Sequence, residues 1–230
     1  MTNALRVGLL VPANNTTMER ELTAWLPAGS TCRTLRIPRG KGMLTSETLP
    51  EYRANALKLA GELADPGIDV VAYGCTAAGF ISGPAGDARL QADLASVTGK
   101  PVVTVARSMV LALQEAGARD IALVTPYLDA VNDQLKAFLG AGGIRVRRFD
   151  SFYAKDVDEL GRIEAPAVAR LARDTMDDTC DALFIACAQL PTREILGDLE
   201  RELGRPALSS IQVTAQKAML AGKTSVTSDQ

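Results

Sequence analysis

The chain has 230 residues, of which 47% are hydrophobic and 23% are charged. This composition is that of a globular protein with a sizeable core, and it excludes a disordered, collagen-like or coiled-coil chain. With 25 basic and 27 acidic residues the net charge is −2, so the chain lacks the positive field that holds nucleic acid. The length fits one large domain or two small ones.

No segment has the length and apolar character of a membrane span or a secretion signal. The longest uncharged run, Val70–Gly86, is interrupted by glycines and a proline and is shorter than a bilayer requires. The apolar run Val7–Val11 is too short for a signal peptide. We therefore expect a cytoplasmic protein with no membrane partner.

Short apolar runs alternate with segments of helical spacing along the chain. Apolar residues at helical intervals predict helices over Thr17–Leu26, Leu49–Ala64, Asp129–Leu139, Pro166–Met176 and Arg193–Leu203. Continuous apolar runs such as Val70–Tyr73 are typical of parallel strands that are buried on both faces and joined by right-handed crossover helices. The sequence therefore predicts an α/β fold.

Three blocks of the first half recur in the same order in the second half. The matched pairs are Arg6–Pro12 with Asp120–Pro126, Asp69–Cys75 with Asp181–Cys187, and Lys100–Thr104 with Arg205–Ser209. Such a repeat indicates two similar units, so we expect two pseudo-symmetric α/β domains, each a small parallel sheet wrapped by helices. Ligands of such sheets bind at the carboxyl ends of the strands, which predicts an active site in the cleft between the domains.

The chain contains no histidine and four cysteines. Proton transfer must therefore use Cys, Asp, Glu, Lys or Tyr. The cysteines form no C-x-x-C pair and have no histidine to complete a zinc site, so we expect free thiols and no metal. No glycine-rich phosphate loop is present, and no cofactor is expected. Cys32 and Cys180, which have no matched partner in the repeat, are expected to be packing residues.

Cys75 and Cys187 occupy matched positions at the ends of two apolar runs. Backbone N–H groups and a helix dipole at a strand-to-helix turn lower the pKa of a thiol, so we expect both cysteines to be reactive and to face each other. The turns that follow them, Thr76–Gly79 and Ala188–Thr192, are small or polar enough for a substrate to approach the backbone. The pair predicts thiol chemistry on a small molecule.

Polar residues at two other strand ends are candidate substrate ligands. Asn14 and Asn15 follow the first apolar run, and beside exposed helix N–H groups they would make a neutral cradle for a carboxylate. Thr16 and Glu19 have the spacing of a capping box at the start of the first helix. Tyr127 lies at the symmetric place in the second half, where it is either a substrate contact or an amphipathic wall residue.

Two motifs resemble those of the aspartate/glutamate racemase superfamily, and within it the branch of maleate cis-trans isomerases and arylmalonate decarboxylases. Val11–Glu19 is similar to the isomerases' Pro-Ser-Ser-Asn-Thr-Thr-Met-Glu, and Cys187–Thr192 is similar to their Cys-x-Gln-Met-Pro-Ser. The surroundings of Cys75 and Tyr127 match as well, and the resemblance covers nearly the whole chain. The decarboxylases have glycine in place of the first cysteine, so Cys75 favours the isomerases.

The resemblance implies a domain division and a reaction. The first domain would comprise 1–105 plus 210–230 and carry Cys75, and the second would comprise 106–209 and carry Cys187. In the isomerases the first cysteine adds as thiolate to maleate, the former double bond rotates, and elimination releases fumarate. Carried over, Cys75 is the nucleophile and Cys187 the acid or base.

The resemblance also implies which residues bind a small carboxylate substrate, and it suggests a homo-oligomer, either a dimer or a tetramer. The side chains of Asn15 and Tyr127 would hold carboxylates, joined by backbone N–H groups in the two turns after the cysteines. The full set of substrate-binding candidates is Asn14, Asn15, Thr76, Ala77, Tyr127, Asp156, Ala188 and Gln189.

Three stretches depart from the isomerase pattern. Ile211 stands within Ser209–Gln212 where an asparagine is expected, the basic loop Arg39–Gly42 differs, and so does Asp156. Asp156 falls where the isomerases place an asparagine that contacts the substrate, and a fixed negative charge there would repel a dicarboxylate. Either the alignment is shifted or the substrate carries an amine, a hydroxyl or a single carboxylate on that side. The basic stretch Arg36–Lys41 is a lid over an anionic site or, more simply, a solvated loop.

The two cysteines favour the hypothesis of maleate isomerisation, and three alternative hypotheses stay open beside it. A two-base racemase would use one thiolate to remove an α-proton and the opposite thiol to return one. A decarboxylase of the arylmalonate type would need only Cys187. A carboxylate-binding module without chemistry would leave both thiols with ordinary pKa values.

Overall fold

The structure is a computed structural model that describes residues 4–226. In the first half of the chain strands alternate with helices, as the apolar runs predict. These elements are β1 (Arg6–Pro12), α1 (Met18–Trp25), β2 (Thr31–Ile37), α2 (Leu49–Ala60), the 3-10 helix η1 (Gly61–Leu63), β3 (Val70–Tyr73), α3 (Thr76–Phe80), α4 (Gly83–Thr98), β4 (Val102–Thr104) and α5 (Val105–Glu115).

The second half of the chain has the same alternation. Its elements are β5 (Asp120–Thr125), α6 (Asp129–Ala141), β6 (Arg145–Ser151), α7 (Val157–Gly161), α8 (Ala165–Thr175), β7 (Ala182–Ile185), α9 (Leu196–Leu203), β8 (Ala207–Ser209) and α10 (Ser210–Val226). The five predicted helices correspond to α1, α2 with η1, α6, α8 and α9, and their ends differ by a few residues, as helix boundaries commonly do.

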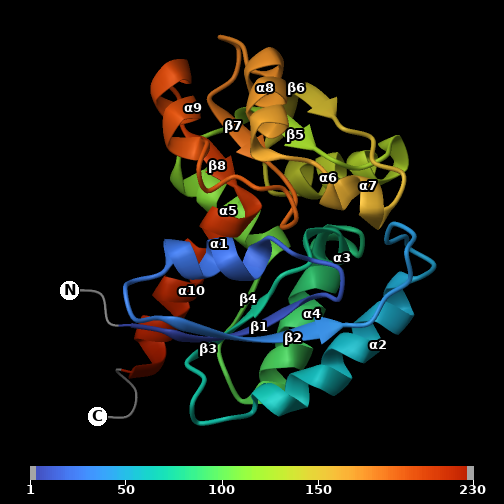
Figure 1. The fold of residues 1–230 in the computed structure, drawn as a ribbon, viewed down its shortest axis with the longest axis vertical. Coiled ribbons are helices and arrows are strands. Elements are labelled where there is room, and N and C mark those ends of the chain that lie inside the picture. Colours follow the sequence, from blue (N-terminus) through green and yellow to red (C-terminus); the bar gives the residue numbers. More distant parts are fainter. Residues whose placement is uncertain (1–3, 227–230) are drawn as a thin grey trace.

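The strands form two parallel sheets, one in each of two lobes (Figure 1). The strand order is β2-β1-β3-β4 in the first sheet and β6-β5-β7-β8 in the second, so the two sheets have the same topology. All residues of the inner strands β3 and β7 are buried, because helices cover both faces of a parallel sheet. The predicted α/β fold with two pseudo-symmetric parallel sheets is confirmed.

A glycine at the end of β3 brings Cys75 to the edge of the first sheet. A Cβ atom on Gly74 would lie 2.5 Å from the sulfur of Met18 and 2.8 Å from a methyl carbon of Val11. Both distances are below van der Waals contact, so a larger residue would push the chain away from β1 and α1. Glycine at this position lets the backbone pass between them and enter α3 directly after Cys75.

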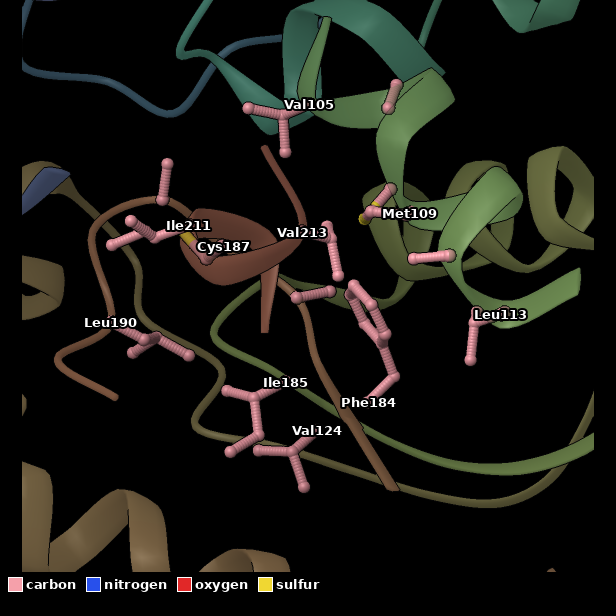
Figure 2. Close-up of a cluster of buried hydrophobic side chains, with 14 of the residues drawn as sticks. Val105, Met109, Leu113, Val124, Phe184, Ile185, Cys187, Leu190, Ile211 and Val213 are labelled. Carbon is pink, nitrogen blue, oxygen red and sulfur yellow. The ribbon is translucent and has the colours of Figure 1, made fainter. Parts of the chain in front are cut away.

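The last helix of each half packs against the other half. In Figure 1 α10 lies in the lobe of β1–β4, where it contacts α1, β3 and β4 in addition to α5. An ion pair of 2.5 Å between Lys217 and Glu115 ties α10 to α5. Conversely, Val105 and Met109 of α5 share a buried cluster with Phe184 of β7 (Figure 2). The two lobes therefore share one apolar core and are not independent units.

The predicted domain boundaries, 1–105 plus 210–230 and 106–209, stay a prediction, and residues 1–3 and 227–230 of the first domain lie outside the described part of the chain. Among residues 4–226, no helix combines the length and the apolar character that a bilayer crossing demands.

Asp87 is an acid buried between α4 and β4, with only 2% of its surface exposed. One carboxylate oxygen accepts a 2.8 Å hydrogen bond from the hydroxyl of Thr104, and the other has no partner. Burial, only partly offset by this bond, raises the pKa of Asp87 to about 6. The charged form is therefore disfavoured in the folded protein.

This buried acid predicts a pH-dependent stability. An unfolded aspartate titrates near pH 3.9, so between that pH and about 6 the folded state holds a proton that the unfolded state has lost. Stability therefore falls as the pH rises through this window. We expect Asp87→Asn to be about 2–3 kcal/mol more stable than the wild type at pH 8 and nearly equal to it at pH 4, measured by urea unfolding. The exposed control Asp178→Asn should have the same unfolding free energy as the wild type at both pH values. Equal stability of Asp87→Asn and wild type at pH 8 would contradict the prediction.

Candidate active site

A small cavity lies where the carboxyl ends of the two sheets meet. The loops after β1, β2 and β3 line it from the first half, and the loops after β5 and β7 together with α6 and α7 line it from the second. Its volume, measured as room for the centres of water molecules, is about 50 Å³. The lining residues are Pro12, Asn14, Asn15, Arg39, Met43, Leu44, Gly74, Cys75, Thr76, Ala77, Tyr127, Val131, Leu160, Cys187, Ala188 and Gln189.

Cys75 occupies the N-cap position of α3. Its extended backbone, with φ of −116° and ψ of 100°, turns the side chain toward the first turn of the helix, as in other N-caps. The backbone N–H groups of Ala77 and Ala78 face its sulfur and favour the thiolate. A helix start therefore holds this cysteine in the cavity wall.

Cys187 has an equivalent arrangement in the second half. The N–H of Gln189 donates to its sulfur at 3.4 Å, and the N–H of Leu190 also favours its thiolate. In both halves, then, the amides two and three residues after the cysteine point at the sulfur. The Tyr127 hydroxyl donates to Cys187 as well, and the hydroxyl of Tyr52 lies within interaction range of Cys75. The sequence repeat is thus a repeat of chemical surroundings.

Burial raises the pKa of both thiols. Cys75 is 5% exposed and Cys187 is 8% exposed, and for each the loss of hydration outweighs the hydrogen bonds that favour the anion. The sequence predicts lowered pKa values at these helix starts, and that prediction is wrong because the turns are buried deeper than an isolated helix start would be. Each thiolate also disfavours the other, because the two sulfurs share one cavity.

Two of the three amide side chains predicted to bind substrate, Asn15 and Gln189, are hydrogen-bonded to the opposite half instead. The amide of Asn15 donates to the carbonyl oxygen of Ala188 at 2.9 Å. Gln189 accepts from the N–H of Thr16 at 3.0 Å and donates to the hydroxyl of Thr16 at 2.9 Å. These bonds connect the two halves across the cavity. Asn14 differs, because its side-chain oxygen is buried without a hydrogen-bond partner.

Asn15 also begins α1. Its side-chain oxygen accepts from the N–H groups of Thr17 at 3.1 Å and Met18 at 2.9 Å. The capping box predicted from Thr16 and Glu19 is wrong, since no side chain caps the helix from the N-cap residue Thr17. The hydroxyl of Thr16 instead accepts a hydrogen bond from the side chain of Gln189 in the second half.

Thr76 and Tyr127 lie between the two cysteines. The hydroxyl of Thr76 accepts from the N–H of Ala188 at 3.1 Å, so this N–H is engaged by the protein. The hydroxyl of Tyr127 interacts with both Thr76 and Cys187. The N–H of Ala77 faces Cys75. All four predicted residues therefore border the sulfurs, and the protein itself already uses several of their polar groups.

Asp156 lies beside the cavity and is not part of its lining. Its carboxylate caps α7 by accepting two backbone N–H bonds of 2.8 and 2.9 Å. Its backbone forms an antiparallel bridge with Gly42, and the N–H of Val157 donates to the carbonyl of Lys41 at 3.3 Å. The loop after β2 thus rests on α7 of the other half (Figure 1).

The basic stretch Arg36–Lys41 is more than a solvated loop, because Arg39 lines the cavity. Arg39 is also the one charged side chain among the described residues of that lining. Sequence reasoning missed its role, although the cluster of basic residues was a signal. Sequence reasoning also missed Tyr52 and the apolar wall of Met43 and Leu160. These residues have no local signal, because only the folded chain brings them together.

Within residues 4–226, no group of cysteine and acidic side chains is arranged to hold a metal ion. All four cysteines are free.

Two thiols, one from each half of a pseudo-symmetric α/β fold, facing one cavity define a class of two-thiol α/β enzyme. The sequence profile of the arylmalonate decarboxylase family matches residues 7–228. The chain belongs to that family, and its predicted place in the branch that also holds the maleate isomerases is confirmed.

The relatives and similar structures include several maleate isomerases. The maleate isomerase of Geobacillus stearothermophilus is 30% identical over 235 residues, which is 95% of this chain and 92% of the relative. The maleate isomerase Iso of Pseudomonas putida S16, solved as a Cys-to-Ala variant with maleate, has a TM-score of 0.85 at 25% identity, covering 92% of this chain and 89% of that one.

A third similar structure contains a covalent intermediate. It is the maleate cis-trans isomerase of Nocardia farcinica, solved as a Cys-to-Ser mutant with a covalently bound succinylcysteine. Its TM-score is 0.84 at 27% identity, covering 95% of this chain and 93% of that one.

Proposed function

We propose that this protein is an isomerase that converts maleate to fumarate with its own two thiols and no cofactor. The observation that carries the proposal is that Cys75 and Cys187, from opposite halves, line one small cavity. A maleate isomerase that is 30% identical over almost the whole chain supports the choice of substrate.

In this reaction Cys75 is the nucleophile. Its thiolate adds to one carbon of the double bond, and the thiol of Cys187 gives a proton to the other carbon, so that a succinyl thioether forms. The single bond between the two carbons then rotates. The Cys187 thiolate takes a proton back from the second carbon, the carbon–sulfur bond breaks, and its electron pair returns to Cys75 as fumarate leaves. No oxidant or reductant is needed.

The cavity supplies groups for the two carboxylates. Arg39 provides a positive charge, and the side-chain NH₂ group of Asn14, which also lines the cavity, can donate to a carboxylate oxygen. The Tyr127 hydroxyl lies next to Cys187, where it can stabilise charge that builds up on a carboxylate during the addition. Met43 and Leu160 form an apolar wall on one side of the cavity.

The presence of two thiols in one cavity favours isomerisation over decarboxylation, which would need only Cys187. The decarboxylase alternative has one feature in its favour, the apolar wall of Met43, Leu44 and Leu160, and it predicts carbon dioxide release that survives Cys75→Gly.

A proton NMR screen in deuterated buffer tests the proposal. Maleate, aspartate, glutamate and an arylmalonate are incubated separately with the protein. We expect the vinyl signal of maleate to be replaced by that of fumarate and the other acids to remain unchanged. Deuterium at the α-carbon of an amino acid would instead indicate a racemase, and loss of a carboxyl group from the arylmalonate a decarboxylase.

The pH profile of maleate turnover follows from the raised thiol pKa values. The reaction needs Cys75 as thiolate, and burial raises the pKa of that thiol, so the thiolate fraction still increases as the pH rises above 8. We expect kcat/KM to be larger at pH 9 than at pH 7, and to fall again where Cys187 loses the proton it must donate. The two apparent pKa values belong to the coupled pair of thiols. A profile that declines steadily from pH 7 to pH 9 would contradict this assignment.

We also propose that the protein works in the cytoplasm, where free thiols remain reduced, and that it forms a homo-oligomer. Sedimentation of the purified protein tests the second point. A single species at the monomer mass would overturn it.

A further inference from the structure

Tyr52 is a buried side chain next to Cys75 that the reaction described above does not use. It is the fourth residue of α2, is 3% exposed, and packs in one apolar cluster with Tyr73 and Cys75. Its hydroxyl is buried and completes no hydrogen bond, yet it lies within interaction range of the Cys75 sulfur. A buried donor without an acceptor costs about 1–3 kcal/mol, so this placement needs a physical reason.

Arg39 approaches the same sulfur from the loop after β2. A second cavity, of about 160 Å³, lies under this loop and is lined by both Arg39 and Tyr52. It shares Arg39, Met43 and Leu44 with the cavity of the cysteines. A 2.5 Å hydrogen bond from the Arg39 guanidinium to the carbonyl of Gly42 fixes the side chain over the site, and its charge acts on both Cys75 and Tyr52.

The protonation state of Cys75 supplies the reason. A neutral thiol is a weak acceptor, whereas a thiolate is a full negative charge that a hydroxyl and a guanidinium both stabilise. Many catalytic cysteines are activated by an adjacent histidine, and this chain has none. We propose that Tyr52 and Arg39 together stabilise the thiolate of Cys75 against its burial, Tyr52 by donating a hydrogen bond to the sulfur and Arg39 by its positive charge.

This inference rests on the proposed role of Cys75 as the nucleophile. The thiol proton passes to water in the cavity before substrate binds, and Tyr52 keeps its own proton throughout, so no bond of the phenol is made or broken. Tyr52 is therefore an activating group and not an acid or base in the reaction.

Other groups around Cys75 also affect the ionisation of its thiol. Burial and the charge of a neighbouring thiolate oppose ionisation, and two backbone N–H groups favour it. Without the hydroxyl and the guanidinium, only those amides would offset burial. The ionisable and polar groups that face Cys75 are Arg39, Tyr52, Tyr73, Tyr127, Cys187 and the amides of Ala77 and Ala78.

The test is the pH dependence of Cys75 alkylation by iodoacetamide, which reacts with the thiolate. It is measured in a Cys187→Ser background, so that one thiol remains in the cavity, and the modified peptide is identified by mass spectrometry. We expect Tyr52→Phe to move the midpoint of the profile up by about one pH unit. Tyr73→Phe is the matched control, because Tyr73 is also fully buried with a hydroxyl that has no partner, and it should leave the midpoint unchanged.

Arg39 provides a second arm in which folding is not at risk, because this residue lies in a partly exposed loop. Arg39→Gln should raise the midpoint, and Arg39→Lys, which keeps the charge, should restore most of the wild-type value. Equal midpoints for Tyr52→Phe and Tyr73→Phe would overturn the role of Tyr52. Equal shifts for Arg39→Gln and Arg39→Lys would overturn that of Arg39.

Alkylation requires no maleate, so the test is independent of the proposed substrate. A protein that leaves maleate unchanged but shows the expected shifts would retain this inference and lose the proposed function. A protein that isomerises maleate but shows no shift in any variant would retain the proposed function and lose this inference.

Discussion

Replacing either Cys75 or Cys187 by serine is expected to reduce maleate turnover by at least about a thousandfold while the fold stays intact. Serine keeps the shape of the side chain, but its hydroxyl does not ionise in the accessible pH range, so it is neither a nucleophile nor a proton carrier at these helix starts. Residues that act as a unit lose most of their effect when one of them is removed. Steady-state turnover and far-ultraviolet circular dichroism give the two measurements.

The two serine variants should differ in whether they form a covalent adduct with maleate. Cys187→Ser retains the nucleophile, so incubation with maleate is expected to add the mass of one maleic acid to the peptide that contains Cys75. Cys75→Ser should form no such adduct. The succinylcysteine found in a Cys-to-Ser mutant of the Nocardia farcinica isomerase is an adduct of this kind. An adduct on Cys187 instead of Cys75 would reverse the assignment of the two roles.

Cys32→Ser is the matched control for these variants. Cys32 lies on β2, is only partly buried, and accepts a hydrogen bond of 3.2 Å from the hydroxyl of Thr23. It does not line the cavity, so its replacement should leave turnover unchanged. Normal activity in Cys75→Ser or Cys187→Ser would remove the two-thiol mechanism.

The repeat in the sequence predicted the fold because it lies in the strands themselves. The run Val70–Tyr73 and its match in the second half are buried on both faces, and only apolar residues fit there, so the pattern survives in both copies. The same repeat placed Cys75 and Cys187 at equivalent strand ends. The exchange of α5 and α10 between the halves has no comparable local signal, because it depends on which helix surfaces meet in three dimensions.

The roles of the polar residues could not be predicted in the same way. Asn15 and Gln189 are polar residues at strand ends, which is the pattern of ligand contacts. In the folded chain, however, Asn15 reaches the carbonyl of Ala188, and Gln189 reaches Thr16. Their partners are more than 170 residues away in sequence. Once the two halves bury these amides, they must find hydrogen bonds within the protein, and only the packing of the halves decides which partners they find.

Glu21 is expected to be the most costly of the polar contacts between the halves to remove. It lies on α1, is 4% exposed, and accepts from the N–H of Thr192 at 3.0 Å, the N–H of Arg193 at 3.0 Å and the hydroxyl of Thr192 at 3.1 Å. These two residues follow Cys187 in the turn that positions its sulfur. Glu21→Ala leaves two backbone N–H groups without an acceptor, at about 1–3 kcal/mol each.

We therefore expect Glu21→Ala to lose about 3 kcal/mol of unfolding free energy in urea and to lower kcat, because the turn that carries Cys187 is no longer fixed. Burial raises the pKa of Glu21, and the hydrogen bonds from Thr192 and Arg193 partly offset this effect. Glu21→Gln keeps one oxygen as acceptor and should lose less than half as much. Thr192→Val keeps both N–H bonds and removes the hydroxyl, which contacts Glu21 and, at 3.0 Å, the hydroxyl of Ser209, so it should cost about 1 kcal/mol. If Glu21→Ala unfolds at the same urea concentration as Thr192→Val, then the backbone bonds to Glu21 do not hold the second half against the first.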